Sequence, residues 1–245
     1  MDRLKGKRAL ITGANSGIGL ETARCFRDEG ARLVVTGLGS VEAARKSLGA
    51  ETTIISSDAG DARAQVELAK AVQQAFGALD ILVVNAGIVE LRPLEKWDET
   101  AFDRSFNINF KGPFFLIQAL LPILANPASV VVTGSINAHI GMPNSSVYAA
   151  SKAALLSLVK TLSGELISRG VRLNAVSPGP IQTPLYDKLG MPKDSAAAIE
   201  FTKLVPAGRF GTPSEIAQAI VFLASGESAF TVGSELVIDG GMSTL

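Results

Sequence analysis

The sequence is poor in the residues that build disulfides and metal sites. Its 245 residues include one cysteine, Cys25, and one histidine, His139. A single cysteine excludes an internal disulfide framework and a cysteine-rich zinc site. His139 has no partner ligands near it in the sequence, so we interpret it as a polar loop contact rather than a metal ligand or a catalytic base. The sequence therefore predicts no metal.

Net charge and long hydrophobic runs are also absent. The 23 Lys and Arg residues balance 23 Asp and Glu residues, which argues against a nucleic-acid binder or a polybasic membrane protein. No stretch approaches the roughly 20 apolar residues of a membrane span, and near the start of the chain the apolar run covers only residues 9–12. We therefore expect a cytoplasmic protein with neither nucleic acid nor membrane as partner.

What the sequence does contain is enough apolar material for one large core. Hydrophobic residues make up 47% and charged residues 19%, proportions that suit a globular domain. No internal repeat, low-complexity tract or linker divides the chain. We expect a single domain over residues 1–245.

Apolar segments of strand length alternate with helical patterns along the chain. The strand candidates are residues 8–12, 32–36, 53–56, 81–85, 130–133, 171–176 and 235–238. Most are near-continuous Val, Ile and Leu, which is typical of strands covered by helices on both faces. Helical patterns lie between them, for example over 19–29, 62–76 and 146–169, and Gly77 and Gly170 follow two of these as caps. This alternation predicts an α/β fold, a doubly wound parallel sheet of Rossmann-like type.

Residues 183–211 differ from the rest of the chain. They contain three prolines and three glycines and show no strand pattern. A long insertion near the carboxyl end of a sheet is typical of a loop that covers substrate, and a plain surface excursion is the alternative.

A glycine-rich turn follows the first strand. It reads TGANSGIG over residues 12–19 and opens the first helix. Gly13 permits the tight turn, Gly17 lets the backbone approach a diphosphate, and Gly19 lets helix and strand pack closely. The helix N-terminus offers free N–H groups to the phosphates. The placement between strand and helix predicts a dinucleotide-binding turn.

Tyr148 and Lys152 are four residues apart, on one face of the long helix. A tyrosine acts as acid or base near neutral pH if its pKa of about 10 falls by two or three units, about 2.7–4 kcal/mol. A lysine about 5 Å away supplies about 3 kcal/mol. A surface pair without function is the alternative. Ser135, at a strand end thirteen residues before Tyr148, and Asn109, on the preceding helical segment, favour the catalytic interpretation.

Taken together, these motifs resemble the compact, single-domain branch of the short-chain dehydrogenase/reductase family over essentially the whole chain. The matching segments are the glycine-rich turn, Asn85-Ala-Gly87, Asn109, Ser135, Tyr148-x-x-x-Lys152, Pro178-Gly179 followed by Thr183, and Asp239-Gly-Gly241.

The resemblance implies an NAD(P)-dependent oxidoreductase. Tyr148 would exchange a proton with the substrate oxygen, and Lys152 would lower the Tyr148 pKa and hold the nicotinamide ribose. Ser135 would orient the carbonyl, and Asn109 would hold a water in a proton relay behind Lys152. The implied cofactor contacts are Gly13, Asn15, Ser16, Gly17, Ile18, Gly19, Gly37, Leu38, Asp58, Ala59, Asn85, Ala86, Gly87, Tyr148, Lys152, Pro178, Gly179, Ile181 and Thr183. The resemblance also implies a homodimer or homotetramer, paired through the helices at 102–124 and 146–169 and the segment 233–245.

Cofactor choice depends on residues 36–40, at the end of the second strand. Gly37 stands where NAD-dependent members have Asp, and Leu38 stands where many NADP-dependent members have Arg. Because the acid that repels a 2′-phosphate is missing, the sequence favours NADP(H), with NAD(H) as the alternative.

Substrate contacts are expected from two loops. The candidates are Asn137, His139, Ile140, Met142 and Asn144, with Tyr186, Leu189 and Met191 from the insertion. This mixed lining suggests a small polar ketone, keto-sugar or β-keto ester rather than a bulky steroid. The alternatives are an NAD-dependent dehydrogenase of a sugar, polyol or hydroxysteroid-like alcohol, and a dinucleotide-binding sensor without catalysis.

Overall fold

A computed structural model describes residues 2–39 and 41–245, so Ser40, within the cofactor-discriminating stretch, lies outside the described residues. Seven parallel strands form one sheet in the order β3-β2-β1-β4-β5-β6-β7. The strands are β1 (Arg8–Ile11), β2 (Arg32–Gly37), β3 (Thr53–Ser56), β4 (Leu79–Val84), β5 (Leu124–Thr133), β6 (Val171–Pro178) and β7 (Glu235–Ile238).

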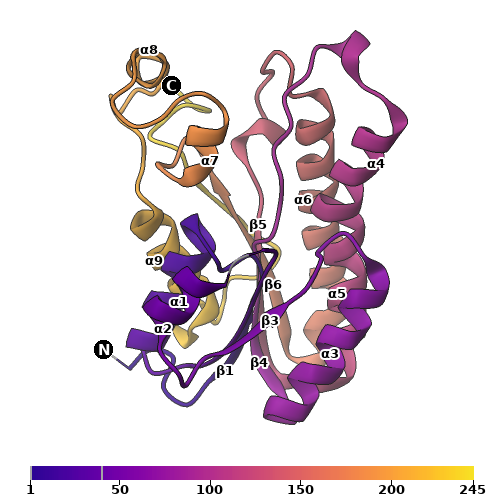
Figure 1. Cartoon of the computed structure of the whole chain (residues 1–245). Helices are drawn as coiled ribbons and strands as arrows, with labels where there is room; N and C mark the ends of the chain where they lie inside the picture. The colour runs from indigo at the N-terminus through magenta and orange to yellow at the C-terminus, as the bar shows by residue number, and fades with distance from the viewer. Residues whose placement is uncertain (1, 40) are drawn as a thin grey trace.

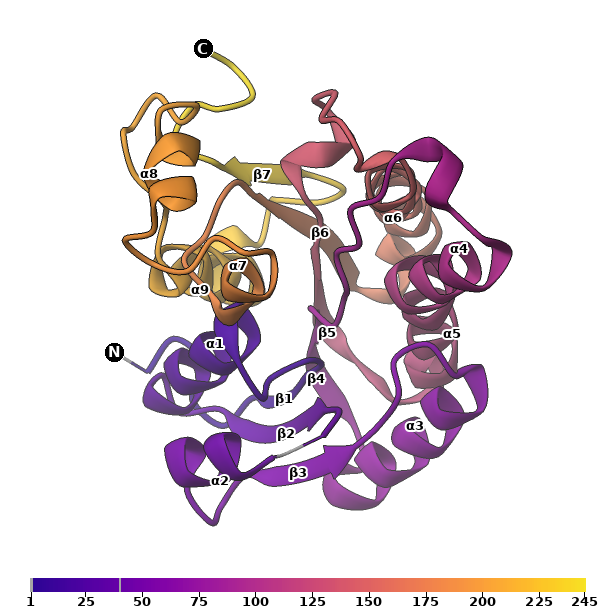
Figure 2. The ribbon, with the colours of Figure 1, turned by 45° about the horizontal axis from the view of Figure 1, so that its top comes forward.

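Helices cover both faces of the sheet (Figures 1 and 2). One face carries α1 (Gly17–Asp28), α2 (Glu42–Leu48) and α9 (Pro213–Ala224). The other carries α3 (Ala62–Phe76), α4 (Glu99–Phe106), α5 (Gly112–Leu120) and α6 (Ser146–Leu166). Each face buries its own apolar cluster, with Phe26 and Ile220 in one and Leu120 and Leu155 in the other. The predicted doubly wound parallel sheet is confirmed.

The predicted and observed boundaries differ where polar residues interrupt a pattern. Strand β5 begins at Leu124 rather than at 130, because the sequence before Val130 contains Asn126 and Pro127. The helix expected over 102–124 is instead α4, a π-helical turn Asn107–Lys111, and α5. The third strand, the last strand and the helix α3 have the predicted bounds.

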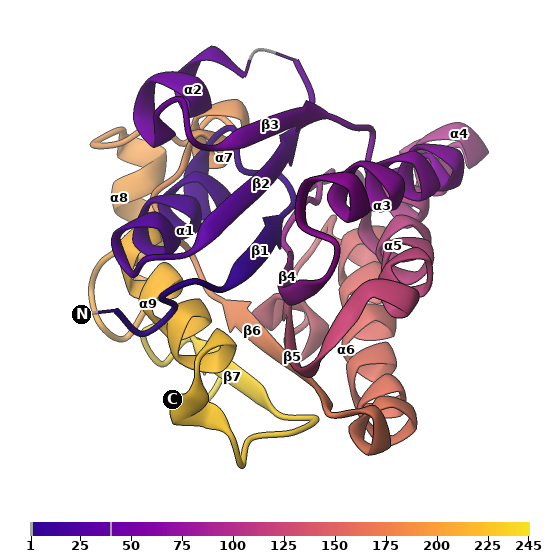
Figure 3. The same cartoon turned by 90° about the horizontal axis from the view of Figure 1, so that it is seen from below.

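The two ends of the sheet carry different connections. Viewed from below, the connections that enter the amino ends of the strands are mostly short, and the longest is the loop of residues 225–234 that leads from α9 into β7 (Figure 3). Above their carboxyl ends lies the insertion 183–211, which forms two short helices, α7 (Pro184–Lys188) and α8 (Ala196–Thr202) (Figure 1). The Gln182 N–H donates to the Gly211 carbonyl at 2.9 Å, which closes the insertion at its base. In the described ranges no helix is both long enough and apolar enough to cross a bilayer.

Candidate active site

The carboxyl ends of β1, β4, β5 and β6 border a cleft of about 490 Å³. This volume falls in the range of small-molecule sites. Every residue that the sequence analysis assigned to the cofactor lines the cleft, and so does Ser135. Parallel strands end on the same edge of a sheet, so motifs that are far apart in the sequence meet here.

The glycine-rich turn forms one end of the cleft with backbone alone. Gly13 has φ +66°, and a Cβ there would lie 2.8 Å from the Ala86 Cα. A Cβ at Gly19 would lie 2.2 Å from the Gly13 carbonyl oxygen. Ser16, the residue before α1, makes no side-chain capping bond, so the first N–H groups of the helix remain available to an anion. These features fit the diphosphate of a dinucleotide.

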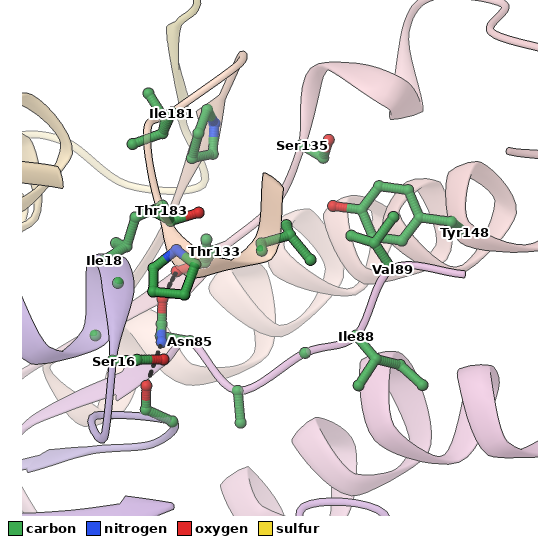
Figure 4. Close-up of a pocket in the computed structure, with 18 of the residues that line it drawn as sticks. Ser16, Ile18, Asn85, Ile88, Val89, Thr133, Ser135, Tyr148, Ile181 and Thr183 are labelled. Atoms are coloured by element: carbon green, nitrogen blue, oxygen red, sulfur yellow. Dashed lines mark hydrogen bonds between the residues drawn. The ribbon is translucent and has the colours of Figure 1, made fainter. Parts of the chain in front are cut away.

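Asn85 ties this turn to the neighbouring strands. Its Nδ2 donates to the carbonyls of Thr12 (3.0 Å) and Gly13 (3.2 Å), and its Oδ1 accepts from the Thr133 hydroxyl at 3.4 Å (Figure 4). The Thr12 Oγ1 in turn accepts from the N–H groups of Asn85 and Ala86, both at 3.0 Å. Asn85 therefore lines the cleft and also links the turn after β1 to the end of β5.

Tyr148 and Lys152 extend from α6 into the other end of the cleft. The Tyr148 hydroxyl lies on the side of the ring that faces the strand ends, with Ser135 nearby (Figure 4). The Lys152 side chain is buried, and its Nζ donates to the Thr133 carbonyl at 2.8 Å. The same Nζ lies 5.9 Å from the centre of the Tyr148 ring. The structure thus brings Ser135, Tyr148 and Lys152 together.

Burial controls the protonation of both groups. It lowers the pKa of Lys152 to about 8. It raises the pKa of Tyr148 above the usual value of 10, and the hydrogen bond with Ser135 offsets only part of that rise. The expected lowering of the Tyr148 pKa by Lys152 is therefore not found in this structure, because burial disfavours the phenolate. Tyr148 is neutral at pH 7 and can donate a proton.

Asn109 lies behind the cleft wall rather than in it. It sits in the π-helical turn and is 1% exposed. Its Oδ1 accepts from the Ile88 N–H (2.9 Å), and its Nδ2 donates to the Ile88 carbonyl (3.0 Å) and to the Ser151 hydroxyl (3.1 Å). Ser151 donates to the Tyr148 carbonyl at 2.7 Å. Asn109 therefore connects the segment after β4 to the first turns of α6.

Only some of the predicted substrate contacts reach the cleft. Asn137, Met142, Tyr186, Leu189 and Met191 line it. His139, Ile140 and Asn144 do not, and including them was wrong. The His139 Nε2 instead lies 2.7 Å from a carboxylate oxygen of Glu235 on β7, the polar contact that the sequence analysis favoured. Asn144 is exposed and has a left-handed backbone with φ 66°.

Several lining residues were missed, and most are apolar. The apolar ones are Ile88, Val89, Leu91, Ile108, Ile136, Pro180, Pro184, Leu185, Phe201 and Met242, and the others are Thr36, Ser57, Thr133, Gly134 and Lys188. Ile88 and Val89 directly follow Asn85-Ala-Gly87, and Leu91 lies two residues further on. Their closeness in sequence to this motif could have identified them as lining residues. No local signal marks Met242, which reaches the cleft through the C-terminal turn. Across residues 2–39 and 41–245, no group of three or more His, Cys, Asp or Glu side chains is arranged to hold a metal.

Comparison with known proteins agrees with this geometry. A family model described as enoyl-(acyl carrier protein) reductase matches residues 13–243. The chain is 37% identical over 247 residues to the 3-oxoacyl-(acyl-carrier-protein) reductase of Thermotoga maritima, covering 98% of this chain and 99% of the relative. It is 39% identical to the 2-keto-3-deoxy-L-fuconate dehydrogenase of Xanthomonas campestris, covering 98% of this chain and 81% of the relative.

A solved structure is similar over the full length. The short-chain dehydrogenase from Burkholderia cenocepacia in complex with NADP superposes with a TM-score of 0.92 at 32% identity, covering 99% of this chain and 100% of that one.

Proposed function

The chain belongs to the short-chain dehydrogenase/reductase family of NAD(P)-dependent oxidoreductases, and from that premise we propose that it is an NADP(H)-dependent reductase of small carbonyl compounds with an apolar substituent. The observation that carries the proposal is the placement of the Tyr148 hydroxyl near Ser135 at the cleft, where both can reach one carbonyl oxygen. A protonated phenol at pH 7 is ready to donate, which is what reduction of a carbonyl requires.

The proposed chemistry assigns a separate task to each residue. The reduced nicotinamide, when bound, supplies a hydride to the carbonyl carbon. Tyr148 gives its hydroxyl proton to the carbonyl oxygen, so that the ketone becomes an alcohol, and Ser135 hydrogen-bonds the same oxygen. Lys152 places a buried positive charge near the ring, which stabilises the phenolate that remains until a proton from solvent restores it.

The preference for NADP(H) is supported by the contacts around Gly37. A Cβ at this position would lie 2.7 Å from the Asn15 Cγ, and the Asn15 Nδ2 donates to the Leu38 carbonyl at 2.8 Å. An Asp at position 37 would therefore displace Asn15. Without that carboxylate, nothing negative at this position opposes a 2′-phosphate.

The preference for an apolar substituent is supported by the cleft walls beyond Ser135. Ile88, Val89 and Leu91 line one side, and residues of the insertion such as Leu185 and Leu189 line another. We propose that the insertion 183–211 covers the substrate. A sugar hydroxyl buried against these apolar side chains would lack a hydrogen-bond partner there, which costs about 1–3 kcal/mol for each such group. This lining is more apolar than the sequence analysis expected.

A second candidate is an NAD-dependent dehydrogenase of a sugar or a sugar acid. The 39% identity to 2-keto-3-deoxy-L-fuconate dehydrogenase favours it. The two candidates differ in cofactor and in the polarity of the substrate.

The test begins with fluorescence titrations of the purified protein with NADPH and with NADH. We expect NADPH to bind at least tenfold more tightly, which corresponds to about 1.4 kcal/mol. We then expect NADPH-dependent reduction of aliphatic ketones such as 2-hexanone, and a loss of at least about 100-fold in turnover for Tyr148→Phe with unchanged NADPH affinity. Tighter NADH binding together with oxidation of sugar acids would replace this proposal with the second candidate.

A further inference from the structure

The cleft contains a second tyrosine that the proposed chemistry does not use. The chain has two tyrosines, Tyr148 and Tyr186, and both line the same cleft. Tyr186 lies on α7, within the insertion. Because α7 comes from a different part of the chain than α6, the second phenol enters the cleft independently of the first.

The ring of Tyr186 is held in place by an aromatic cluster. It packs edge-on against Phe210, with centroids 4.8 Å apart, and against Phe201 at 6.1 Å. The Tyr186 N–H donates to the Thr183 carbonyl at 3.0 Å, and its carbonyl accepts from the Met191 N–H at 2.9 Å. These contacts fix the position of the Tyr186 ring, and the hydroxyl takes no part in them.

Tyr186 lines the cleft close enough to Tyr148 for the two phenols to interact electrostatically, and its hydroxyl has no hydrogen-bond partner among the described residues. Burial raises the pKa of this phenol well above its usual value of 10, and the nearby Tyr148 adds to the rise. Tyr186 therefore stays protonated over the whole working range of pH. It presents a donor to the cleft, among walls that are otherwise mostly apolar.

We propose that the Tyr186 hydroxyl determines substrate specificity by donating a hydrogen bond to a second oxygen of the substrate, on the carbon next to the reacting carbonyl. This inference rests on the proposed function. The preferred substrates are then aliphatic α-dicarbonyl or α-hydroxy ketone compounds rather than simple ketones. A substrate without the second oxygen leaves the Tyr186 hydroxyl unpaired, which lowers its affinity.

The experiment compares 2,3-hexanedione with 2-hexanone, which share a carbon chain and differ by one oxygen. Binding of each to the protein loaded with NADP⁺ is measured by calorimetry, since the oxidised cofactor does not reduce them. We expect the wild type to bind the dione at least about fivefold more tightly, and Tyr186→Phe to lose that preference while its affinity for 2-hexanone stays within about twofold. Leu91→Ala is the control, which alters the apolar wall, leaves the aromatic cluster around Tyr186 intact, and should weaken both ligands alike.

Turnover with NADPH separates this inference from the proposed function. The ratio of kcat/KM between wild type and Tyr186→Phe cancels the greater intrinsic reactivity of the dione. If the protein bound the dione selectively but did not reduce it, the proposed function would be wrong and the proposed role of Tyr186 would stand. Equal binding of the two ligands by the wild type, or an equal loss for both in Tyr186→Phe, would overturn the inference. No binding of either ligand would also overturn it.

Discussion

At the residue scale, Lys152 shows how a buried charged side chain in the cleft lowers the free energy of unfolding. Its ammonium is buried and its pKa is lowered to about 8 from the 10.5 of an exposed lysine. Between those two values the unfolded chain binds more protons than the folded one, so the free energy of unfolding rises with pH across that window. Below about pH 8 the destabilisation is complete and amounts to about 3 kcal/mol.

Replacement of this lysine tests that account. We expect Lys152→Met to raise the free energy of unfolding at pH 7 by about 1–2 kcal/mol, since it removes the buried charge and also loses the bond to Thr133. The gain should shrink as the pH rises from 8 toward 10.5, and turnover should be lost. Denaturant unfolding at pH 7 and pH 10 measures both. Lys152→Arg, which retains the charge, should show no gain, and a less stable Met variant at pH 7 would contradict the account.

Gly37 allows a second test at a single position. Gly37→Asp and its control Gly37→Ala place the same Cβ 2.7 Å from the Asn15 Cγ, but only the first adds a charge. We expect the Asp variant to bind NADPH at least tenfold more weakly than the Ala variant, because the carboxylate repels the 2′-phosphate. The NADH affinities of the two variants should agree within about threefold. Fluorescence titration measures all four affinities, and equal NADPH affinities would place the 2′-phosphate elsewhere.

At the scale of elements, the π-helical turn Asn107–Lys111 positions a buried side chain behind the site. Such turns inside helices are frequent at functional sites. Here the turn lets Asn109 face the segment after β4, where it bonds both backbone groups of Ile88. An uninterrupted helix over 102–124 would advance by 100° per residue and aim this side chain elsewhere.

Removing the Asn109 amide should loosen two elements at once. We expect Asn109→Ala to lower the free energy of unfolding by about 2–3 kcal/mol, because the Ile88 backbone groups and the Ser151 hydroxyl lose their partner in a buried site. Ser151→Ala breaks only the last of these contacts and should cost about 1 kcal/mol. Chemical denaturation of both variants gives the comparison. Equal losses would show that the bonds to Ile88 contribute nothing.

The C-terminal turn shows how an element distant in sequence completes the cleft. The Asp239 carboxylate accepts from the N–H groups of Gly241 (2.9 Å) and Ser243 (2.7 Å). Asp239 also packs against Gly179, where an added Cβ would lie 2.6 Å from the Asp239 Cβ. These contacts bring Met242 to the wall of the cleft. The Asp239-Gly-Gly241 motif therefore contributes to the site indirectly, because it forms the turn that brings Met242 to the cleft.

For the whole molecule, exposed apolar side chains mark two surfaces. Phe230 is fully exposed and lies near the edge strand β7, where Leu236 and Val237 are each 37% exposed. Phe102 of α4 is 43% exposed. An edge strand with apolar side chains offers both main-chain and hydrophobic contacts to another copy. Phe102, Leu236 and Val237 belong to the segments from which the sequence analysis expected a homodimer or homotetramer, and Phe230 lies just before the last of them.

Light scattering after size-exclusion chromatography tests this expectation. We expect the wild type to be a dimer or tetramer, and Leu236→Lys to shift it to a smaller species because a charge at the edge opposes pairing of two copies. Val66→Lys is the control, since Val66 is 44% exposed but lies on α3, at the end of the sheet remote from β7 (Figure 2). A monomeric wild type would contradict the expectation.

The sequence by itself determined the seven strands, their alternation with helices, the glycine-rich turn and the Tyr148–Lys152 pair. These features depend on periodicity and spacing over a few residues, which are properties of the chain before it folds. It also determined that His139 makes a polar contact, because a lone histidine has no ligand partners.

Only the tertiary structure decided which residues share the cleft and in what protonation state. Val89, Leu185 and Met242 lie on three segments that are far apart in the sequence, and nothing local predicts that they line the same cleft. Asn109 lies behind that wall because a π-helical turn redirects it. The direction of the Tyr148 pKa is set by burial under elements distant in sequence. Desolvation is a sum over all neighbours in space, so it exists only once the chain has folded.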